Sequence, residues 1–362
     1  MSLSEQQVQA ALKEVVDPNT GKDLVSSRCI KNVKVSGADV SLDVELGYPA
    51  RSQIDGIRKL VIDQLKPIAG TGNISANVYS KIVPHTVQKG VKLVSGVKNI
   101  IAVASGKGGV GKSTTAVNLA LALAAEGARV GILDADIYGP SQPQMLGISG
   151  QPESMDGKKL EPMTAYDLQA MSVGFLVDPE TPMVWRGPMV TQALTQLLGD
   201  TNWQDLDYLV VDLPPGTGDI QLTLAQQVPV TGAVIVTTPQ DIALLDARKG
   251  LKMFEKVGIP ILGIVENMSI HICSKCGNEE HIFGSGGAEK MGQDYEVEVL
   301  GHLPLDINIR MQVDGGKPTV VADPDGRVAE IYRGIARRVA IKIAEKAKDM
   351  TSRFPNIVIQ NT

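Results

Sequence analysis

The sequence predicts an α/β protein with a doubly wound, mostly parallel sheet, preceded by a small α+β domain. The first observation is that short apolar runs alternate with helical patterns through the larger part of the chain. These runs are Ile100–Ala104, Val130–Leu133, Tyr208–Val211, Ala233–Val236 and Ile261–Val265. Strands that are apolar along their whole length are typical of parallel sheets, because helices cover both faces of such a sheet. The second observation is a glycine-rich segment directly after the first run.

The beginning of the chain predicts the small α+β domain. Apolar residues recur at helical spacing over 4–16 and 53–65, and they alternate with polar residues over 30–36 and 39–47. A further strand is expected over 73–80. A unit of about 80 residues lies near the lower size limit for independent folding.

We therefore divide the chain into four parts. They are the small domain at 1–83, a linker at 84–98, the large α/β domain at 99–350 and a C-terminal tail at 351–362. The last predicted helix, over 327–348, has an apolar side and a basic side. A helix that lies on a membrane would show the same pattern, but we favour packing against the sheet.

Composition narrows the classes of function. The chain has 362 residues, of which 43% are hydrophobic and 4% aromatic, and its net charge is −5. We expect no nucleic-acid partner for an acidic chain with few aromatic side chains.

Three cysteines, Cys29, Cys273 and Cys276, are too few for a disulfide framework and suit a reducing compartment. Since neither a signal peptide nor a membrane-spanning run is evident, we expect a cytoplasmic protein without a membrane partner.

The glycine-rich segment Gly106–Ser113 reads GKGGVGKS and fits the pattern G-x-x-x-x-G-K-[ST] between a strand and a helix. Glycines allow successive backbone N–H groups to point inward, which creates an anion site at a helix N-terminus. Lys112 is expected to reach the β- and γ-phosphates of a nucleotide, and the Ser113 hydroxyl to bind Mg²⁺. The predicted nucleotide-binding residues are Gly106, Lys107, Gly108, Gly109, Val110, Gly111, Lys112, Ser113 and Thr114.

Lys107 adds a second lysine to this loop. The segment GKGGVGKST resembles the deviant Walker motif of the dimeric ATPase class that includes MinD, the ArsA-type ATPases and the nitrogenase iron protein. The resemblance implies that the chain binds ATP and that Lys107 reaches the nucleotide of a partner subunit. Hydrolysis then requires a homodimer, and Lys107 and Lys112 are both catalytic candidates.

Three aspartates follow strands near this loop. Asp134 and Asp136 come after the run 130–133, and Asp212 directly follows the run 208–211. Carboxylates at strand ends beside a phosphate loop suit Mg²⁺ binding and the positioning of a water molecule. We assign Mg²⁺ binding to Asp212 and, as a second candidate, to Asp134. The resemblance to the dimeric ATPases implies that Asp136 orients the attacking water and is the third catalytic candidate.

Two further segments follow apolar runs. Leu213–Asp219, with the sequence LPPGTGD, is too rich in proline and glycine for a helix and is expected to sense the γ-phosphate.

Asn267 comes shortly after the run 261–265. In similar ATPases an asparagine at this place binds adenine, which makes Asn267 the base-recognition candidate. A simple turn asparagine is the alternative.

Cys273 and Cys276 are separated by two residues and flanked by His271 and His281. Two thiolates can hold a metal but do not complete a zinc or iron–sulfur site. A redox pair, a zinc site within one chain that uses one of the histidines, and an inert pair are alternatives. We favour a fourth interpretation, in which two such pairs on a dimer axis supply the four thiolates of a [4Fe–4S] cluster.

Seven segments in chain order resemble the Mrp/ApbC family of iron–sulfur cluster carrier ATPases. They read GKGGVGKST, DADIYGPS, WRGPM (Trp185 to Met189), DLPPGTGD, TTPQDIALLDARKG, GIVENMS and CSKCG. The resemblance implies a homodimer that hydrolyses ATP slowly, holds a labile [4Fe–4S] cluster on Cys273 and Cys276, and works with iron–sulfur apoproteins and assembly factors. It also places the segment between Pro239 and Lys249 near the dimer and nucleotide interface. A MinD-like spatial organiser and a zinc-stabilised regulatory ATPase are the rival functions.

The first domain resembles the MIP18-like domain that is often fused to these ATPases. That domain commonly has a cysteine in a P-x-C turn, where this sequence reads Pro49-Ala50-Arg51. Cys29 lies on a predicted strand and is interpreted as a packed thiol. We therefore expect this domain to recognise partners and not to bind a cluster.

Overall fold

The computed structural model describes residues 3–70, 72–85, 93–155, 157–177, 187–273 and 275–353. The chain forms two compact units. One consists of Met1–Val83 with Ala125–Gly127, and the other of Pro84–Ala124 with Ala128–Thr362. Residues 86–92 of the predicted linker and 354–362 of the predicted tail lie outside the described residues.

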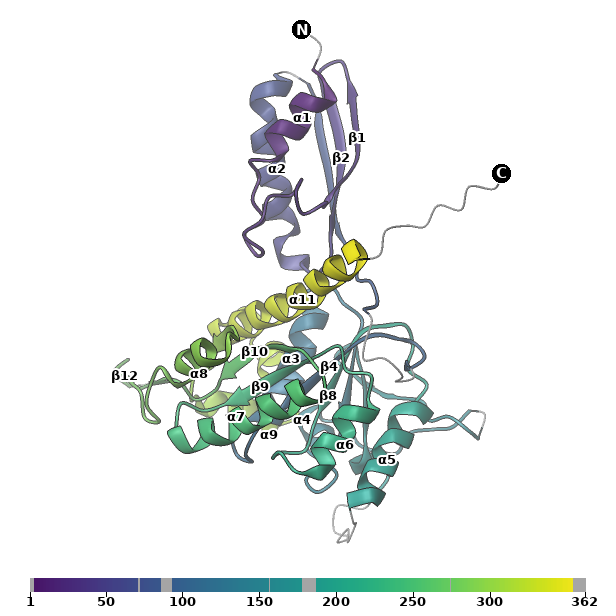
Figure 1. The fold of residues 1–362 in the computed structure, drawn as a ribbon, viewed down its shortest axis with the longest axis vertical. Coiled ribbons are helices and arrows are strands. Elements are labelled where there is room, and N and C mark those ends of the chain that lie inside the picture. The colour runs from purple at the N-terminus through teal and green to yellow at the C-terminus, as the bar shows by residue number, and fades with distance from the viewer. Residues whose placement is uncertain are drawn as a thin grey trace. The chain divides into compact units, whose positions relative to one another are not determined.

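The first unit is a three-stranded sheet with two helices (Figure 1). The strands are β1 (Ile30–Ser36), β2 (Asp39–Leu46) and β3 (Ile74–Ser80), and the helices are α1 (Glu5–Leu12) and α2 (Ile54–Ala69), the latter preceded by the 3₁₀ turn η1 (Arg51–Gln53). The central strand β2 is antiparallel to β1 and parallel to β3. The predicted α+β class of this unit is therefore confirmed.

Local signals explain where the helices of this unit begin and end. Ser4 and Gln7 form a capping box at the start of α1, since each side chain accepts a hydrogen bond from the backbone N–H of the other residue. Gly70 ends α2 with a φ of +60°. Cys29 is buried, in agreement with a packed thiol, but it precedes β1 and does not lie on the strand as predicted.

The second unit contains an eight-stranded sheet in the order β13-β10-β9-β4-β8-β5-β7-β6. The strands are β4 (Val97–Ala104), β5 (Val130–Asp134), β6 (Met163–Ala165), β7 (Leu168–Ser172), β8 (Leu206–Asp212), β9 (Gly232–Thr237), β10 (Ile261–Glu266) and β13 (Val299–His302). All neighbours are parallel except β6 and β7. The five predicted apolar runs are all strands of this sheet, and the mostly parallel fold class is confirmed.

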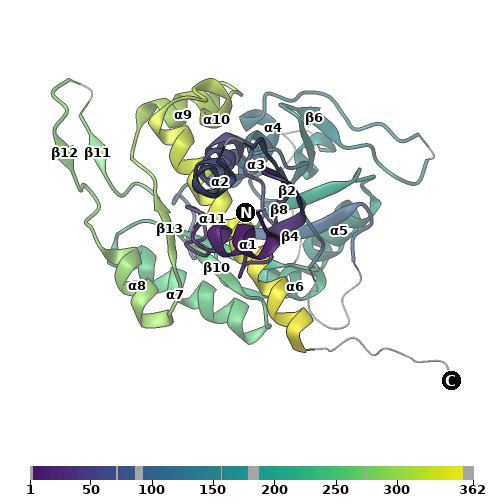
Figure 2. The ribbon, with the colours of Figure 1, turned by 90° about the horizontal axis from the view of Figure 1, so that it is seen from above.

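Helices cover both faces of the sheet. Figures 1 and 2 show α3 (Lys112–Ala125) and α11 (Arg327–Arg353) on one face, and α5 (Gly187–Asp200), α6 (Asp219–Gln227) and α7 (Asp241–Lys256) on the other. The remaining helices are α4 (Gln142–Met145), the 3₁₀ turn η2 (Val173–Phe175), α8 (Gly287–Tyr295), α9 (Ile307–Asp314) and α10 (Thr319–Ala322). The last helix, α11, packs against β10 and β13, which confirms the predicted packing against the sheet.

None of the helices in the described part of the chain combines the length and the apolar character that crossing a membrane would need.

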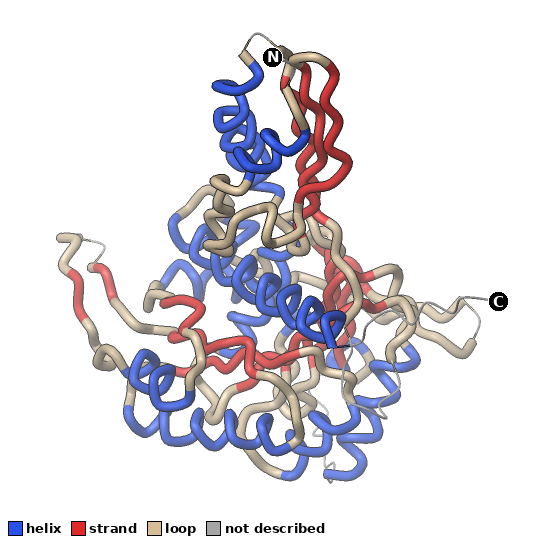
Figure 3. The backbone as a smooth tube through the Cα atoms, turned by 45° about the horizontal axis from the view of Figure 1, so that its top comes forward, coloured by secondary structure: helices blue, strands red, loops and turns tan. Residues whose placement is uncertain are grey.

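A small hairpin projects from the second unit. It consists of β11 (His271–Ile272) and β12 (Glu279–Glu280), and Figures 2 and 3 show it extending away from the sheet. The hairpin follows β10 in the chain, and β10 is a parallel strand of the same sheet as β4, β5 and β8, so the carboxyl ends of these strands lie along one edge. In a parallel sheet these ends share one edge, and the loops there form the ligand site.

Candidate functional site

The loop between β4 and α3 requires glycine at several positions. Gly109 and Gly111 have φ values of +82° and +81°, a region that favours glycine. A Cβ atom on Gly111 would lie 2.2 Å from Nδ2 of Asn267. One on Gly106 would lie 2.2 Å from the carbonyl carbon of Asp246. The chain thus turns tightly here and leaves backbone N–H groups at the start of α3.

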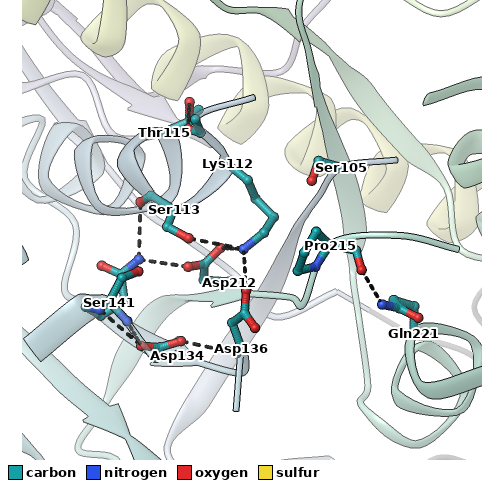
Figure 4. A network of polar contacts seen from close by, with 12 residues as sticks. Ser105, Lys112, Ser113, Thr115, Asp134, Asp136, Ser141, Asp212, Pro215 and Gln221 are labelled. Carbon is teal, nitrogen blue, oxygen red and sulfur yellow. Dashed lines mark hydrogen bonds and ion pairs between the residues drawn. The ribbon is translucent and has the colours of Figure 1, made fainter. Parts of the chain in front are cut away.

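Lys112, the first residue of α3, faces carboxylates from the neighbouring strand ends (Figure 4). Its Nζ atom lies 2.5 Å from Oδ1 of Asp212, 3.2 Å from Oγ of Ser113 and 3.9 Å from Oδ2 of Asp136. The Lys112 side chain is 6% exposed and Asp212 is fully buried. Each charge compensates the other in a site from which water is largely excluded. Four of the predicted site residues therefore lie together.

Asp134 uses both carboxylate oxygens to fold the segment that follows it. Oδ1 accepts a hydrogen bond from the N–H of Asp136 at 3.1 Å. Oδ2 accepts from the N–H groups of Ser141 at 2.9 Å and Gln142 at 3.0 Å, and from Oγ of Ser172 at 3.1 Å. This geometry favours a role in positioning the loop. A direct contact of Asp134 with Mg²⁺ stays a prediction.

Two carboxyl groups of this site, those of Asp134 and Asp136, have raised pKa values. Burial, together with the charge of Asp212, raises the pKa of Asp134 to about 7, although backbone N–H groups and Lys112 act in the opposite direction. Burial is also the main cause that raises the pKa of Asp136, and Lys112 opposes it. Carboxylates gathered in such a site favour the approach of a cation.

Gln142 was not singled out in the sequence. It is 1% exposed, and its Nε2 donates to Oδ2 of Asp212 at 2.9 Å and to the carbonyl oxygen of Ser113 at 3.1 Å. No motif points to this residue, because its position depends on the loop that Asp134 folds. It is a further member of the site.

Lys107 lies at the exposed side of the loop. Its Nζ atom is 3.4 Å from Oδ2 of Asp246 on α7, and its side chain is 41% exposed. Asp246 also pairs with Lys249 at 2.9 Å. The hydrogen bond with Lys249 is the main cause that lowers the pKa of Asp246, and Lys107 contributes. The segment between Pro239 and Lys249 thus contacts the phosphate loop within one chain.

The loop after β8 lies against the phosphate loop. The N–H of Gly216 donates to the carbonyl oxygen of Ser105 at 2.9 Å, and Gly216 has a φ of +106°. Nε2 of Gln221 donates to the carbonyl oxygen of Pro215 at 2.6 Å (Figure 4). As predicted, this segment is not helical until α6 begins at Asp219.

Asn267 supports the phosphate loop directly. It is 8% exposed, and its Nδ2 donates to the carbonyl oxygen of Val110 at 2.9 Å. The contact explains why the chain places an asparagine directly after β10. Base recognition by Asn267 stays a prediction.

A pocket of about 540 Å³ opens beside the phosphate loop. Its walls come from residues 107–110, from residues 238 and 240–243 before and at the start of α7, and from Met268 and Phe283. The size lies in the range of small-molecule sites. Since Phe283 follows the hairpin in sequence, the pocket joins the phosphate loop to the segment that carries the two thiols.

The two thiols lie at the tip of the hairpin formed by β11 and β12. The N–H of Cys273 donates to the carbonyl oxygen of Asn278 at 2.9 Å, and the N–H of Gly277 donates to that of Cys273 at 2.8 Å. Gly277 has a φ of +72°, as a tight turn requires. Cys276 is exposed and Cys273 is partly exposed, so both sulfurs lie near the surface.

The environment of Cys273 favours the thiolate. Hydrogen bonds from the N–H groups of Lys275 and Cys276 are the main causes that lower the pKa of the Cys273 thiol. The thiolate is the form that binds metals. The turn therefore favours the form of this sulfur that can bind a metal.

Among the described residues, the flanking histidines do not complete a metal site with the two cysteines. Nδ1 of His271 lies 3.1 Å from the carbonyl oxygen of Leu305, and Nδ1 of His281 lies 2.7 Å from that of Ser269. Across the described ranges, no three His, Cys, Asp or Glu side chains are grouped so that they could hold a metal ion. A zinc site within one chain thus has no third ligand in that part of the molecule.

One predicted motif is only partly described. Trp185 and the residue after it lie outside the described residues, whereas Gly187–Met189 begin α5. Nothing in the site described above depends on them.

The fold and this site define a P-loop NTPase. The diagnostic features are a parallel sheet, a glycine-rich loop between β4 and α3, and a buried lysine beside a carboxylate at the end of a neighbouring strand. A family model described as NUBPL iron-transfer P-loop NTPase matches residues 96–340, and one described as iron–sulfur cluster assembly protein matches residues 5–78. The chain belongs to the family of NUBPL-type iron-transfer P-loop NTPases.

Similar proteins carry matching descriptions. The iron–sulfur cluster carrier protein of Haemophilus influenzae is 52% identical over 338 residues, which cover 93% of this chain and 91% of that protein. The carrier protein of Escherichia coli K12 is 55% identical over 312 residues, 85% of each. The mouse iron–sulfur cluster transfer protein NUBPL is 52% identical over 254 residues, 70% of this chain and 80% of that protein. The resemblance to iron–sulfur cluster carriers is therefore confirmed.

Solved structures agree with the fold. A nucleotide-binding protein from Archaeoglobus fulgidus in complex with ADP is 37% identical, has a TM-score of 0.57, and the match covers 66% of this chain and 93% of that chain. The cell division ATPase MinD of Pyrococcus furiosus is 23% identical with a TM-score of 0.51, and the match covers 67% and 98%. The second likeness concerns the fold alone.

Proposed function

We propose that the protein is an ATP-hydrolysing carrier that holds a [4Fe–4S] cluster between two copies of the chain and passes it to apoproteins. The observation that carries the proposal is the exposed hairpin tip of a chain of this family, where two thiols lie and no third ligand joins them among the residues that the structure describes. Two copies related by a two-fold axis would supply four thiolates, the number that such a cluster requires.

The nucleotide site supports ATP binding with Mg²⁺. Its residues fit the ion, because a fully buried carboxylate and a hydroxyl lie within reach of the same lysine. When nucleotide binds, Lys112 would turn from Asp212 to the phosphates, and Asp212 and Ser113 would hold Mg²⁺. The ion would withdraw charge from the phosphate oxygens. Asp136 is then placed to orient the attacking water.

The arrangement of Lys107 supports a role in a dimer. Its partner Asp246 belongs to the same chain, and the lysine is partly exposed. Exposed ion pairs contribute only about 0–1 kcal/mol, so Lys107 can leave Asp246 at little cost. A second copy could therefore receive this lysine at its nucleotide, as the sequence motif implies.

The cluster is treated as cargo. Transfer requires that a bound cluster can be released, and exposed thiols at a hairpin tip are accessible to a recipient protein. ATP can promote release only if the states with and without ATP differ in cluster affinity. Partner recognition by the first unit and a cytoplasmic location stay predictions.

Anaerobic reconstitution tests the cargo. We expect the full chain, treated with iron and sulfide, to gain a [4Fe–4S] spectrum with about two irons per chain. Cys273→Ser and Cys276→Ser should each abolish the spectrum, because two pairs are needed for four ligands. Cys29→Ser is the matched control and should retain it, since that thiol is buried in the other unit. A cluster that survives loss of either hairpin cysteine would contradict the proposal.

The rival functions lack equivalent support. A MinD-like spatial organiser leaves the hairpin thiols without a role. A zinc-stabilised regulator would need a third ligand that the described residues do not provide. Metal analysis after reconstitution separates the zinc alternative, and ATP-dependent sedimentation with liposomes separates the organiser.

A further inference from the structure

Ser105 is a buried residue whose polar atoms bind two different loops of the nucleotide site. It directly follows β4 and is 2% exposed. Its hydroxyl donates a hydrogen bond to the carbonyl oxygen of Lys107 at 2.8 Å, and its own carbonyl oxygen accepts one from the N–H of Gly216 at 2.9 Å. Ser105 therefore connects the start of the phosphate loop to the loop after β8.

The backbone on both sides of Lys107 is held in place. On the N-terminal side, Gly106 packs so closely against α7 that a Cβ atom there would lie 2.2 Å from the carbonyl carbon of Asp246. On the C-terminal side, the Ser105 hydroxyl binds the carbonyl group of Lys107. Since the peptide group is planar, this bond also orients the peptide that joins Lys107 to Gly108. The backbone thus determines the direction in which the lysine side chain leaves the loop.

The side chain of Lys107 is held more weakly than its backbone. Its ion pair with Asp246 spans 3.4 Å, and the lysine side chain is 41% exposed. Exposed ion pairs are weak, because water screens both charges and the long side chains lose conformational freedom. Where this lysine can reach therefore depends on how the backbone directs its Cα–Cβ bond, and Ser105 contributes a side-chain bond to that stretch of backbone.

Ser105 is also tied to the loop that is expected to sense the γ-phosphate. That loop has its own support, because Nε2 of Gln221 donates to the carbonyl oxygen of Pro215 at 2.6 Å (Figure 4). A Cβ atom on Gly108 would be in ordinary contact with Pro215, whose Cγ would lie 3.9 Å away. The loop after β8 thus lies against the phosphate loop at Ser105 and Gly108, which are close to Lys107 on either side of it.

We infer that Ser105 is a positioning residue for Lys107 in the ATP-hydrolysing dimer. Its hydroxyl holds the backbone so that the lysine side chain projects toward the nucleotide of a partner subunit. Its carbonyl oxygen connects the same stretch of backbone to the loop after β8. The inference rests on the proposed hydrolysis of ATP by a dimer in which Lys107 acts across the interface.

The inference is tested by the kinetics of ATP hydrolysis by the full chain, measured as phosphate release. We expect Ser105→Ala to lower kcat about fivefold, as the loss of one hydrogen bond predicts, with the KM for ATP and the Kd for ADP changed less than about twofold. Thr201→Val is the matched control. It removes an equally buried hydroxyl, which donates to the carbonyl oxygen of Leu197 at 2.6 Å directly after α5, and it should keep the wild-type rate.

A double-mutant cycle separates the positioning of Lys107 from a general effect on the phosphate loop. If Ser105 acts through the lysine, Ser105→Ala should cause less than about a twofold further loss of rate in a Lys107→Ala background. Single-turnover reactions keep the slow rates of these variants measurable. A further loss of about fivefold in the double variant would show that Ser105 acts independently of Lys107 and would overturn the inference.

Two other results would also overturn the inference. They are an unchanged kcat in Ser105→Ala, and a loss of ADP affinity in that variant as large as its loss of kcat. Full turnover in Lys107→Ala would instead overturn the proposed cross-subunit mechanism itself. Thermal melts identify a variant that fails to fold, and Ser105→Cys then replaces Ser105→Ala in the same cycle, because a thiol is only a weak donor.

Discussion

Lys112 and Asp212 form a buried ion pair between the start of α3 and the end of β8. Removing one partner of such a pair leaves an unpaired charge in a site that excludes water, which typically costs about 3–5 kcal/mol. If Lys112 is removed, the unpaired carboxylate of Asp212 is also repelled by the nearby carboxylate of Asp134. The same lysine that is expected to bind the nucleotide therefore also stabilises the carboxyl end of β8.

The first prediction concerns this pair. Lys112→Ala should abolish measurable ATP binding and also lower the free energy of unfolding by about 3 kcal/mol, measured by urea denaturation without nucleotide. Adding Asp212→Asn should restore part of the stability, because it removes the uncompensated charge. The control is Lys98→Ala, whose 2.7 Å partner is Asp207 but whose side chain is 30% exposed, and it should cost no more than about 1 kcal/mol. Equal losses in Lys98→Ala and Lys112→Ala would contradict the argument.

The second prediction concerns pH and His302 at the end of β13. Its Nδ1 lies 3.2 Å from Glu266 and its Nε2 lies 2.9 Å from Glu289. The hydrogen bond with Glu266 is the main cause that raises the pKa of His302; burial and the nearby Arg338 oppose it, and Glu289 adds to it. The protonated ring is therefore favoured in the folded protein.

A raised pKa in the folded state stabilises the protein fully below the unfolded value of about 6.5, and this stabilisation is lost as pH rises through the folded value. We expect the wild type to exceed His302→Gln in unfolding free energy by more at about pH 6 than at about pH 9. Urea denaturation of both proteins at the two pH values measures this difference. A difference that grows with pH would have the wrong sign.

At the scale of elements, two factors decide which positions of the phosphate loop require glycine: the backbone conformation and the room available for a Cβ atom. Gly111 combines a φ of +81° with a neighbour, Nδ2 of Asn267, at 2.2 Å from its hypothetical Cβ. Gly108 has no positive φ, and the nearest atom to its Cβ would be Pro215 Cγ at 3.9 Å. A Cβ atom would therefore fit at Gly108 but not at Gly111.

The third prediction follows from this difference. Gly111→Ala should lower the free energy of unfolding by about 2 kcal/mol, because a strained backbone and a displaced Asn267 both contribute. Gly108→Ala should change it by less than about 1 kcal/mol. Both are measured without nucleotide by urea denaturation. Similar losses in the two variants would show that the position of Asn267 does not constrain the loop.

The hairpin of β11 and β12 is the least supported element that carries site residues. A two-stranded hairpin by itself is marginal in water. Here the N–H of Leu305 donates to the carbonyl oxygen of Ile270 at 2.8 Å, and Ser269 pairs with Leu303, so the segment after β13 holds the base of the hairpin. Figure 3 shows the two strands of the hairpin extending beyond this support. This suits the proposed transfer of a cluster.

At the scale of the whole molecule, the proposed mechanism requires two chains. The fourth prediction is that Lys107→Ala lowers the ATP hydrolysis rate at least about tenfold and changes the Kd for ADP by less than about twofold, because the lysine acts on a partner's nucleotide. Hydrolysis is measured by phosphate release. Lys249→Ala is the matched control, since Lys249 also pairs with Asp246, and it should retain the wild-type rate. Full turnover in Lys107→Ala would contradict a cross-subunit role.

The fifth prediction concerns assembly. Because Lys107 must leave Asp246 to reach a partner, Asp246→Asn should favour the ATP-bound dimer by a few-fold, in line with the small contribution of an exposed pair. Sedimentation of the full chain with ATP measures the monomer and dimer fractions. A lower dimer fraction in Asp246→Asn would mean that Asp246 itself contributes to the dimer.

Much of the fold could be predicted because local sequence patterns indicate it. The apolar runs that became β4, β5, β8, β9 and β10 are central strands, covered by helices on both faces, and their composition shows it. The strands β6, β7 and β13 were missed. They are short and lie at or near the sheet edges, where no continuous apolar run is needed.

The sequence by itself determined the fold class, the phosphate loop and the thiol pair, because each depends on spacing within a few residues. Only the tertiary structure decided which side chains meet at the loop. Gln142 reaches Asp212 across 70 positions of the chain, and Asn267 reaches Val110 across 157. Such contacts exist only after parallel strands have brought their carboxyl ends to one edge, and no local pattern records them.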